Sequence, residues 1–208
     1  DLFHAQSVKV PLIIYDPSHQ ADCTRGMVSD ALVEAIDLTA SFVEHASGEV
    51  PKHILEGKSL WPIVHGLQKE LDRDFVVSEY DYSQQKMAKS LGVQPKDARL
   101  FMIADKEWKF MHAEGGFRPM LFDLRIDPHE LNDLGADSAY QNIIDIMYQR
   151  LGRWSLRMSQ RTTIDDDTIE KKQSSNSDVG IILGVYDDNE ISDRSSSFYK
   201  GLSKGRYS

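Results

Sequence analysis

Apolar and polar positions are distributed differently before and after about residue 67. In the first part, residues 9–16 form an almost continuous apolar run, Lys-Val-Pro-Leu-Ile-Ile-Tyr-Asp. A run without polar alternation is typical of a strand covered on both faces, as in a parallel α/β sheet. Pro11 fits only near the start of such a strand, where no ladder donor is lost. We find no equivalent partner strands for it in this sequence.

A helix is predicted after a polar loop that passes through Arg25 and Gly26. Its apolar positions repeat at intervals of three and four: Ile36, Thr39, Phe42, Val43 and Ala46. Gly48 is a plausible stop. The first half of residues 28–46 does not decide between strand and helix, so residues 9–48 give a strand, a loop, a short extended piece and a helix. This order is half of an α/β unit.

Beyond a polar connector at 67–74 the pattern predicts four short strands rich in aromatic and β-branched residues. They are Phe75–Tyr82, Arg99–Ala104, Glu107–Ala113 and Met120–Leu124. Turns at 105–106 and 115–116 make the last three consecutive, so an antiparallel meander is expected. Strand alternation places Trp108, Phe110 and His112 on one face.

A helix with one apolar stripe follows the meander. Ser138 and Gln141 have the spacing of a capping box. The stripe consists of Tyr140, Ile143, Ile144, Met147, Leu151, Trp154 and Met158. We expect this helix to cover the sheet. Residues 161–208 are mostly polar but contain an apolar strand at 179–186, which needs a sheet edge on this chain or on a neighbouring subunit.

Three regions are therefore predicted: the end of an α/β sheet domain at 1–66, an α+β subdomain at 67–160, and a polar tail with a terminal strand at 161–208. The net charge of -9 argues against nucleic acid or anionic lipid as partners, because both require a basic surface. The sequence also lacks an apolar run of about 18 residues, so no membrane span is expected. Small molecules and proteins remain as partners. The single cysteine is compatible with a reducing compartment, which favours the cytoplasm without establishing it.

The residues themselves show no complete catalytic motif. The single cysteine, Cys23, is interpreted as an ordinary loop thiol, and the seven histidines lack zinc-binding spacing. His112 is interpreted as structural and His129 as an exposed turn residue. The acidic runs at 165–167 and 187–190 lack the alternating ligands of a calcium loop, so solvated turns are expected there. A Gly-x-Ser-x-Gly elbow is missing as well.

Three stretches resemble the sulfatase family. Leu121-Phe122-Asp123-Leu124, followed by Asp127-Pro128, Glu130 and Asn132 to Leu134, matches the strand and turn near that family's carboxyl end. Residues 57–66, Gly-Lys-Ser-Leu-Trp-Pro-Ile-Val-His-Gly, match a second family motif. Ile36-Asp37-Leu38 matches a third, although Ala40 and Ser41 stand where proline and threonine are usual.

The resemblance implies the C-terminal part of an alkaline-phosphatase-superfamily enzyme, most similar to the phosphonate monoester hydrolase and arylsulfatase branch. The chain begins at Asp1 without a methionine, which also suggests a fragment. The intact enzyme would hydrolyse sulfate, phosphate or phosphonate esters of small molecules, using a formylglycine-type nucleophile and a divalent Ca, Mn or Mg ion. It would be a homo-oligomer to which the tail contributes. No catalytic residue, metal ligand or cofactor is expected within these residues, so the chain alone should be inactive.

One site residue follows from the resemblance. In this family the strand matching residues 10–16 comes soon after the active-site segments, so residues 1–7 would emerge from the active-site rim. His4 is therefore the candidate substrate-binding residue. Two alternatives remain: a noncatalytic acidic α+β module that binds a protein partner through its terminal strand, and a different esterase, for which the nucleophile pattern is missing.

Overall fold

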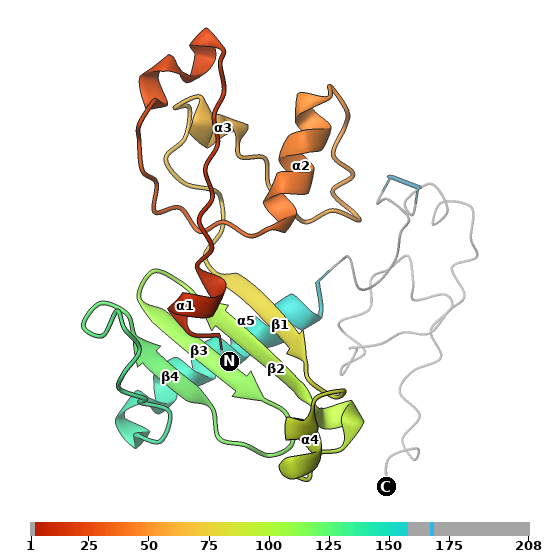
Figure 1. Cartoon of the computed structure of the whole chain (residues 1–208), viewed down its shortest axis with the longest axis vertical. Coiled ribbons are helices and arrows are strands. Elements are labelled where there is room, and N and C mark those ends of the chain that lie inside the picture. The colour runs from red at the N-terminus through yellow and green to blue at the C-terminus, as the bar shows by residue number, and fades with distance from the viewer. Residues whose placement is uncertain (1–2, 158–166, 169–208) are drawn as a thin grey trace, which may run out of the picture. The chain divides into compact units, whose positions relative to one another are not determined.

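The computed structural model describes residues 3–157 and 167–168 (Figure 1). Apart from residues 167–168, everything described here belongs to one compact unit, Asp1–Thr163. The predicted strand at 179–186 and position 158 of the helical stripe lie outside the described residues. An oligomer built on that strand therefore stays a prediction. Within the described residues, no helix is both long and apolar enough to cross a membrane.

The predicted meander is confirmed. Its strands are β1 (Val76–Asp81), β2 (Arg99–Ala104), β3 (Trp108–Ala113) and β4 (Met120–Asp123). They pair in the order β1-β2-β3-β4, and every pair is antiparallel. Ile103 faces Phe110 across one pair and Phe110 faces Leu121 across the next. The polar excursion between β1 and β2 contains two short elements that were not predicted, α4 (Lys86–Ser90) and the 3-10 helix η2 (Pro95–Asp97).

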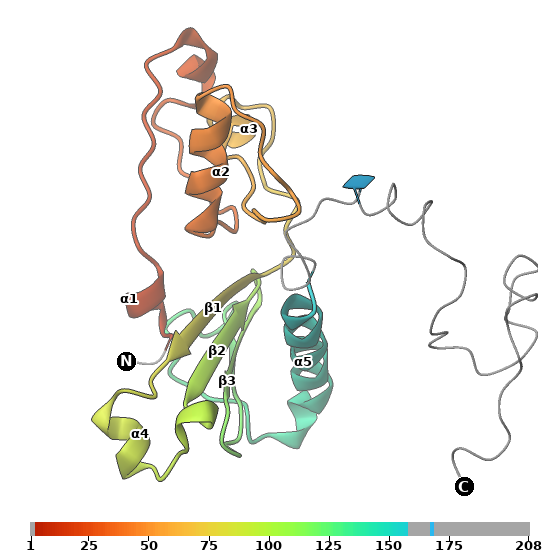
Figure 2. The ribbon, with the colours of Figure 1, turned by 90° about the vertical axis from the view of Figure 1, so that its right-hand side faces the viewer.

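The helix α5 (Gln141–Ser155) covers one face of the sheet, as predicted (Figure 2). Its Ile144 and Met147 join Ile103, Phe110 and Leu121 in the main core. The Tyr148 ring stands edge-on against Phe110 at 4.8 Å between centroids. Each fully buried side chain of this size contributes roughly 1.5–3 kcal/mol before entropy is counted. The meander and α5 therefore complete a hydrophobic core between them.

The predicted capping box at the start of α5 is wrong. A 3-10 turn, η3 (Ser138–Tyr140), precedes the helix, and its N-cap is Asp137. The Asp137 carboxylate accepts from the Ala139 amide at 2.9 Å. A carboxylate is about as good an N-cap as a serine hydroxyl, and its negative charge is favourable near the positive end of a helix dipole. The Gln141 amide donates instead to Asp145, one helical turn on, at 2.8 Å.

The opposite face of the sheet packs against the start of the chain. Met102, Met111 and Phe122 are buried there, and Phe3 and Val8 pack over them. Val8 ends the short helix α1 (Ala5–Val8). Figure 2 shows α1 and α5 on opposite sides of the strands. The amino-terminal segment is thus part of the second core of the sheet.

The predicted strand at 9–16 is not formed. The backbone there is extended, but it belongs to no sheet within the part of the chain that the structure describes. Val10, Ile13 and Tyr15 are 79%, 91% and 75% exposed. A strand exists only where a ladder partner satisfies its N–H and C=O groups. The apolar run lacks that partner here, and a six-residue 3-10 helix, η1 (His19–Thr24), follows it.

The predicted helix is confirmed as α2 (Ile36–His45), whereas the residues of 28–46 that precede it form no regular element. The helix ends in a Schellman arrangement, in which the Gly48 N–H donates to the Val43 carbonyl at 2.9 Å. Ser47, rather than Gly48, adopts the left-handed backbone at a φ of 59°. A short helix, α3 (Trp61–Val64), lies within the second family motif.

The turn after β4 is held by Asp127, whose carboxylate accepts from the Asn132 amide at 2.7 Å. Leu134 packs against the main core, whereas Leu131 is 85% exposed. Gly135 is required where the chain passes Pro119, because a Cβ at position 135 would lie 2.1 Å from the Pro119 carbonyl oxygen. The family-like stretch is therefore a tightly packed corner of the sheet.

Candidate functional site

Asp37 links two of the stretches that resemble the sulfatases. Its carboxylate is fully buried and accepts two hydrogen bonds from the Arg73 guanidinium, both at 2.6 Å. It also accepts from the Lys58 amide at 2.8 Å and the Glu34 amide at 2.7 Å. Burial alone would raise the pKa of Asp37, but these hydrogen bonds outweigh it and hold the pKa below its ordinary value. Asp37 is therefore a charged structural anchor.

Ser41 joins the same two stretches. Its hydroxyl accepts from the Leu60 amide at 2.9 Å, and its carbonyl accepts from the Trp61 indole N–H at 2.9 Å. Gly57 allows the close approach, because a Cβ at that position would lie 2.2 Å from the Ile36 carbonyl oxygen. These two motifs thus fix the packing of α2 against the 57–66 segment.

A pocket of about 470 Å³ opens beside this packing. Its walls include an aromatic stack, in which Trp61 lies 5.1 Å from the His45 ring and 5.5 Å from the His65 ring. Two carboxylates, Asp16 and Glu44, also line it. The lining contains no lysine or arginine to receive the anionic oxygens of a sulfate or phosphate ester. The pocket is therefore a poor site for such an ester.

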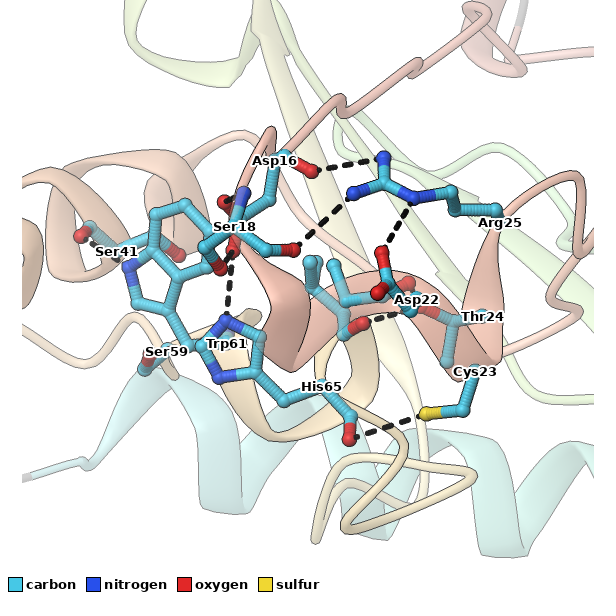
Figure 3. A network of polar contacts seen from close by, with 12 residues as sticks. Asp16, Ser18, Asp22, Cys23, Thr24, Arg25, Ser41, Ser59, Trp61 and His65 are labelled. Carbon is cyan, nitrogen blue, oxygen red and sulfur yellow. Dashed lines mark hydrogen bonds and ion pairs between the residues drawn. The ribbon is translucent and has the colours of Figure 1, made fainter.

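Asp16 organises the turn beside the pocket, as Figure 3 shows. Its carboxylate accepts from the Ser18 amide at 2.8 Å and contacts the His65 ring at 2.9 Å. These hydrogen bonds, the Ser18 amide first and His65 second, lower the pKa of Asp16 to about 2. Arg25 closes the loop by donating to the Asp16 carbonyl at 3.0 Å and to the Asp22 carboxylate at 2.9 Å. The charged groups of Asp16, Asp22 and Arg25 therefore stabilise the loop in which they lie.

Cys23 lies in the same loop and is exposed. Its sulfur is 3.6 Å from the His65 carbonyl oxygen, and among the described residues no hydrogen bond joins it to an imidazole. A cysteine nucleophile requires a nearby base or cation that lowers the pKa of its thiol. The geometry therefore supplies no activating partner for Cys23.

A second polar cluster is built around Glu130, on the sheet face that α1 covers. Lys109 lies between Trp108 and Phe110 in the sequence of β3. The rings of these two neighbours pack toward α5, and the Lys109 side chain points to the opposite face. Its ammonium donates to the Glu130 carboxylate at 2.5 Å and to the Phe3 carbonyl at 3.0 Å. Lys109 is 2% and Glu130 5% exposed. Burial holds the pKa of Lys109 below its ordinary value, although the bond to Glu130 opposes that shift.

His4 completes this cluster. Its Nδ1 lies 2.9 Å from the second carboxylate oxygen of Glu130, which also accepts from the Ala5 amide at 3.3 Å. The edge of the His4 ring packs on Phe122 at 5.6 Å between centroids. The His4 side chain is 34% exposed, whereas that of Glu130 is 1% exposed. The imidazole is thus fixed on one side and open on the other.

Glu130 and Lys109 were not predicted as a site. Strand alternation alone would place Lys109 opposite Trp108 and Phe110, on what reads as a solvent face. The only signal was the glutamate of the family motif after Asp127-Pro128. His129 is exposed as expected, and the His112 ring contacts the Tyr148 hydroxyl at 3.2 Å.

The described residues do not fit a catalytic metal. Nowhere among them do three or more His, Cys, Asp or Glu side chains come together in a group that could hold an ion. Glu130 is already neutralised by Lys109, and Asp37 by Arg73. We therefore derive no chemical step through a metal held by these residues.

Comparison with known proteins gives the class to which this arrangement belongs. The structure resembles the phosphonate monoester hydrolase of Agrobacterium radiobacter with a TM-score of 0.57, at 24% identity, over 64% of this chain and 27% of that one. The phosphonate monoester hydrolase SpPMH from Silicibacter pomeroyi gives the same TM-score. At this identity the likeness establishes the fold alone, an antiparallel sheet covered by a helix.

The sequence comparisons identify the family. Residues 1–157 match the model of the family described as N-sulphoglucosamine sulphohydrolase, C-terminal, and the chain belongs to this family. It is 28% identical over 165 residues to the multifunctional alkaline phosphatase superfamily protein PehA of Trinickia caryophylli, covering 77% of this chain. It is 26% identical over 141 residues to an arylsulfatase of Clostridium perfringens, covering 68% of this chain. The matches span 31% and 26% of the lengths of these two relatives.

Proposed function

We propose that this chain is the C-terminal part of a metal-dependent hydrolase that cleaves sulfate, phosphate or phosphonate esters of small molecules. The observation that carries the proposal is the family match over residues 1–157, combined with relatives that are sulfatase-superfamily proteins. The formylglycine-type nucleophile and the ligands of a divalent cation would lie in a part of the protein outside these residues. The chain would then support the catalytic domain and contribute one residue to the rim of the active site.

The exposed run at 10–15 supports this division of labour. Val10, Ile13 and Tyr15 are 79%, 91% and 75% exposed, and Leu12 and Ile14 are still 45% and 40% exposed. Both faces are therefore partly open, as expected for a strand that is buried on both sides once partner strands are present. We propose that residues 1–66 finish the catalytic α/β sheet and that residues 67–160 form the supporting subdomain.

His4 would contribute directly to the ester site. It precedes the exposed run by a few residues, so it lies where the chain would leave the catalytic sheet. Its imidazole is held by the hydrogen bond to Glu130, and its side chain is 34% exposed. We assign it to substrate binding rather than to bond cleavage, because no nucleophile or metal-ligand group accompanies it among the described residues.

The test compares two polypeptides. One is the chain of 208 residues alone, and the other extends upstream of Asp1 to the nearest in-frame start codon that follows a stop. Each is assayed with p-nitrophenyl sulfate and with a p-nitrophenyl phosphonate monoester, before and after removal of divalent metal. Only the longer polypeptide should turn over ester, and it should lose activity on chelation. Turnover by the isolated chain would show that the nucleophile lies within these residues, which would contradict the proposal.

The same experiment addresses the competing function. A start codon directly before Asp1, with no turnover of either ester, would reject the hydrolase in favour of the noncatalytic acidic module. Upstream sequence that encodes a cysteine- or serine-type sulfatase motif and an Asp-His-Gly segment would support the hydrolase.

A further inference from the structure

The hydrogen bonds of the Glu130 cluster are concentrated on three consecutive residues at the start of the chain, Phe3, His4 and Ala5. The Glu130 carboxylate contacts the His4 ring and the Ala5 amide, while Lys109, which Glu130 holds, donates to the Phe3 carbonyl. Glu130 itself has a φ of 59°, a conformation that is uncommon for residues other than glycine. Such backbone strain persists only where surrounding contacts impose it. The cluster thus fixes both the backbone and the ring of His4.

We propose that Glu130 is a positioning residue that acts through His4. A carboxylate only accepts hydrogen bonds, so the His4 nitrogen that faces it, Nδ1, must carry the proton. The opposite nitrogen, Nε2, has no partner in the portion that the structure describes. Glu130 therefore fixes the ring orientation so that Nε2 faces outward. In the protonated imidazole, Nε2–H is the donor that would bind an anionic oxygen of the ester.

Lys109 balances the negative charge of the buried Glu130 carboxylate. Its ammonium lies on one Glu130 oxygen and leaves the other for His4. A buried pair of this kind is costly to break, because the remaining charge has no partner. The pair therefore forms a rigid support, and a ring held by a rigid support loses little entropy when substrate binds. This inference rests on the proposed function, because it assigns His4 toward an ester.

The test is a double-mutant cycle in the longer polypeptide described above. Glu130→Gln keeps the volume and one acceptor oxygen but removes the charge, and His4→Ala removes the ring. Either change alone should raise KM for the aryl ester, roughly tenfold for His4→Ala, with kcat changed less than about twofold. In the His4→Ala background, Glu130→Gln should leave KM unchanged within about twofold, because its effect passes through the ring.

Glu114→Gln is the matched control, since it removes a carboxylate that directly follows β3 and is paired with Arg99 instead. It should leave KM unchanged. Thermal unfolding of every variant separates loss of fold from loss of positioning, and Glu130→Gln should lower the melting temperature in both His4 backgrounds, because Lys109 loses its partner in each.

Three results would overturn the assignment. One is a KM that does not respond to His4→Ala, and another is a Glu130→Gln effect of equal size with and without His4, which would make Glu130 merely structural. In both cases the unmodified polypeptide still turns over ester, so the proposed function stands. Absence of turnover by the unmodified polypeptide would reject the proposed function and this assignment together.

Discussion

The apolar residues of the meander and those of the run at 10–15 differ in how far they are buried. In the meander, Ile103, Phe110 and Leu121 are 0% exposed. In the run at 10–15, Val10, Ile13 and Tyr15 are at least 75% exposed. The difference is pairing, since each meander strand has a hydrogen-bonded neighbour and the run has none among the described residues. An apolar pattern therefore predicts the tendency to form a strand, and the ladder partner decides whether burial follows.

The region around the exposed run is held together mainly by polar contacts. Its own apolar cluster contains only three buried side chains, Leu60, Ile63 and Leu71. The stronger links are the bidentate Arg73–Asp37 pair and the hydrogen bonds of Ser41. The meander is thus stabilised by hydrophobic burial, and residues 28–73 by a buried ion pair. Variants in each region can test this contrast.

The largest effect should come from the meander core. Phe110→Ala removes a fully buried ring at the centre of the sheet and should lower the free energy of unfolding by about 4 kcal/mol. Ile13→Ala, the matched change in the exposed run, should cost less than about 0.5 kcal/mol. Urea unfolding of the chain measures both. Equal losses would mean that the run is buried in this chain after all.

The second effect concerns the ion pair. Asp37→Asn removes the bidentate carboxylate from the buried Arg73, which keeps only the Glu34 carboxylate, 3.3 Å away, as a countercharge among the described residues, and should cost about 3 kcal/mol at neutral pH. The pKa of Asp37 is lowered in the folded chain, so its stabilisation is present above the unfolded pKa, near 3.8, and is lost as the pH falls through the lower folded value.

The stability difference between the unmodified chain and Asp37→Asn should therefore shrink below about pH 4. The comparison isolates Asp37, because Asp16, Asp123 and other aspartates with lowered pKa values remain in both proteins. A difference that stays constant from pH 7 to pH 3 would contradict a charged Asp37.

The third effect is steric. Gly135→Ala would place a Cβ 2.1 Å from the Pro119 carbonyl oxygen, and relieving that clash should cost about 2 kcal/mol. Gly152→Ala is the control, because a Cβ at position 152 of α5 meets nothing within 4 Å. It should stabilise the chain by about 0.5–1 kcal/mol through helix propensity. Unfolding midpoints that move in the same direction would show that the corner after β4 is looser than described.

The meander was predictable because each of its features is local. Aromatic and β-branched runs, short turns and a helical stripe all point to the same arrangement, so strands, order and the covering helix were confirmed. The strand at 9–16 failed for the opposite reason, because strand formation depends on a partner that local sequence does not encode. The capping box failed because Asp137, one position earlier, competes with Ser138 for the same turn.

The candidate site was only partly accessible to sequence reasoning. His4 was named from its position along the chain, a prediction that no observation yet tests. Its partners could not be foreseen, because Glu130 and Lys109 lie 126 and 105 residues away in sequence and meet it only through the register of the sheet. Glu130 is part of the family motif, but its contacts with His4 and Lys109 can be recognised only in the structure.

The smallest effect tests whether the loop after the exposed run is ordered by its own contacts. The pKa of Asp16 is lowered to about 2, first by the Ser18 amide and then by His65. His65→Ala should therefore raise this pKa without restoring the ordinary value, since the Ser18 hydrogen bond remains. His45→Ala, which removes the other ring stacked on Trp61, should leave it unchanged. Carboxyl chemical shifts followed by NMR from pH 1.5 to 6 measure all three proteins. An ordinary pKa of 3.8 for Asp16 in the unmodified chain would show that polar contacts do not hold this loop when the neighbouring run is unpaired.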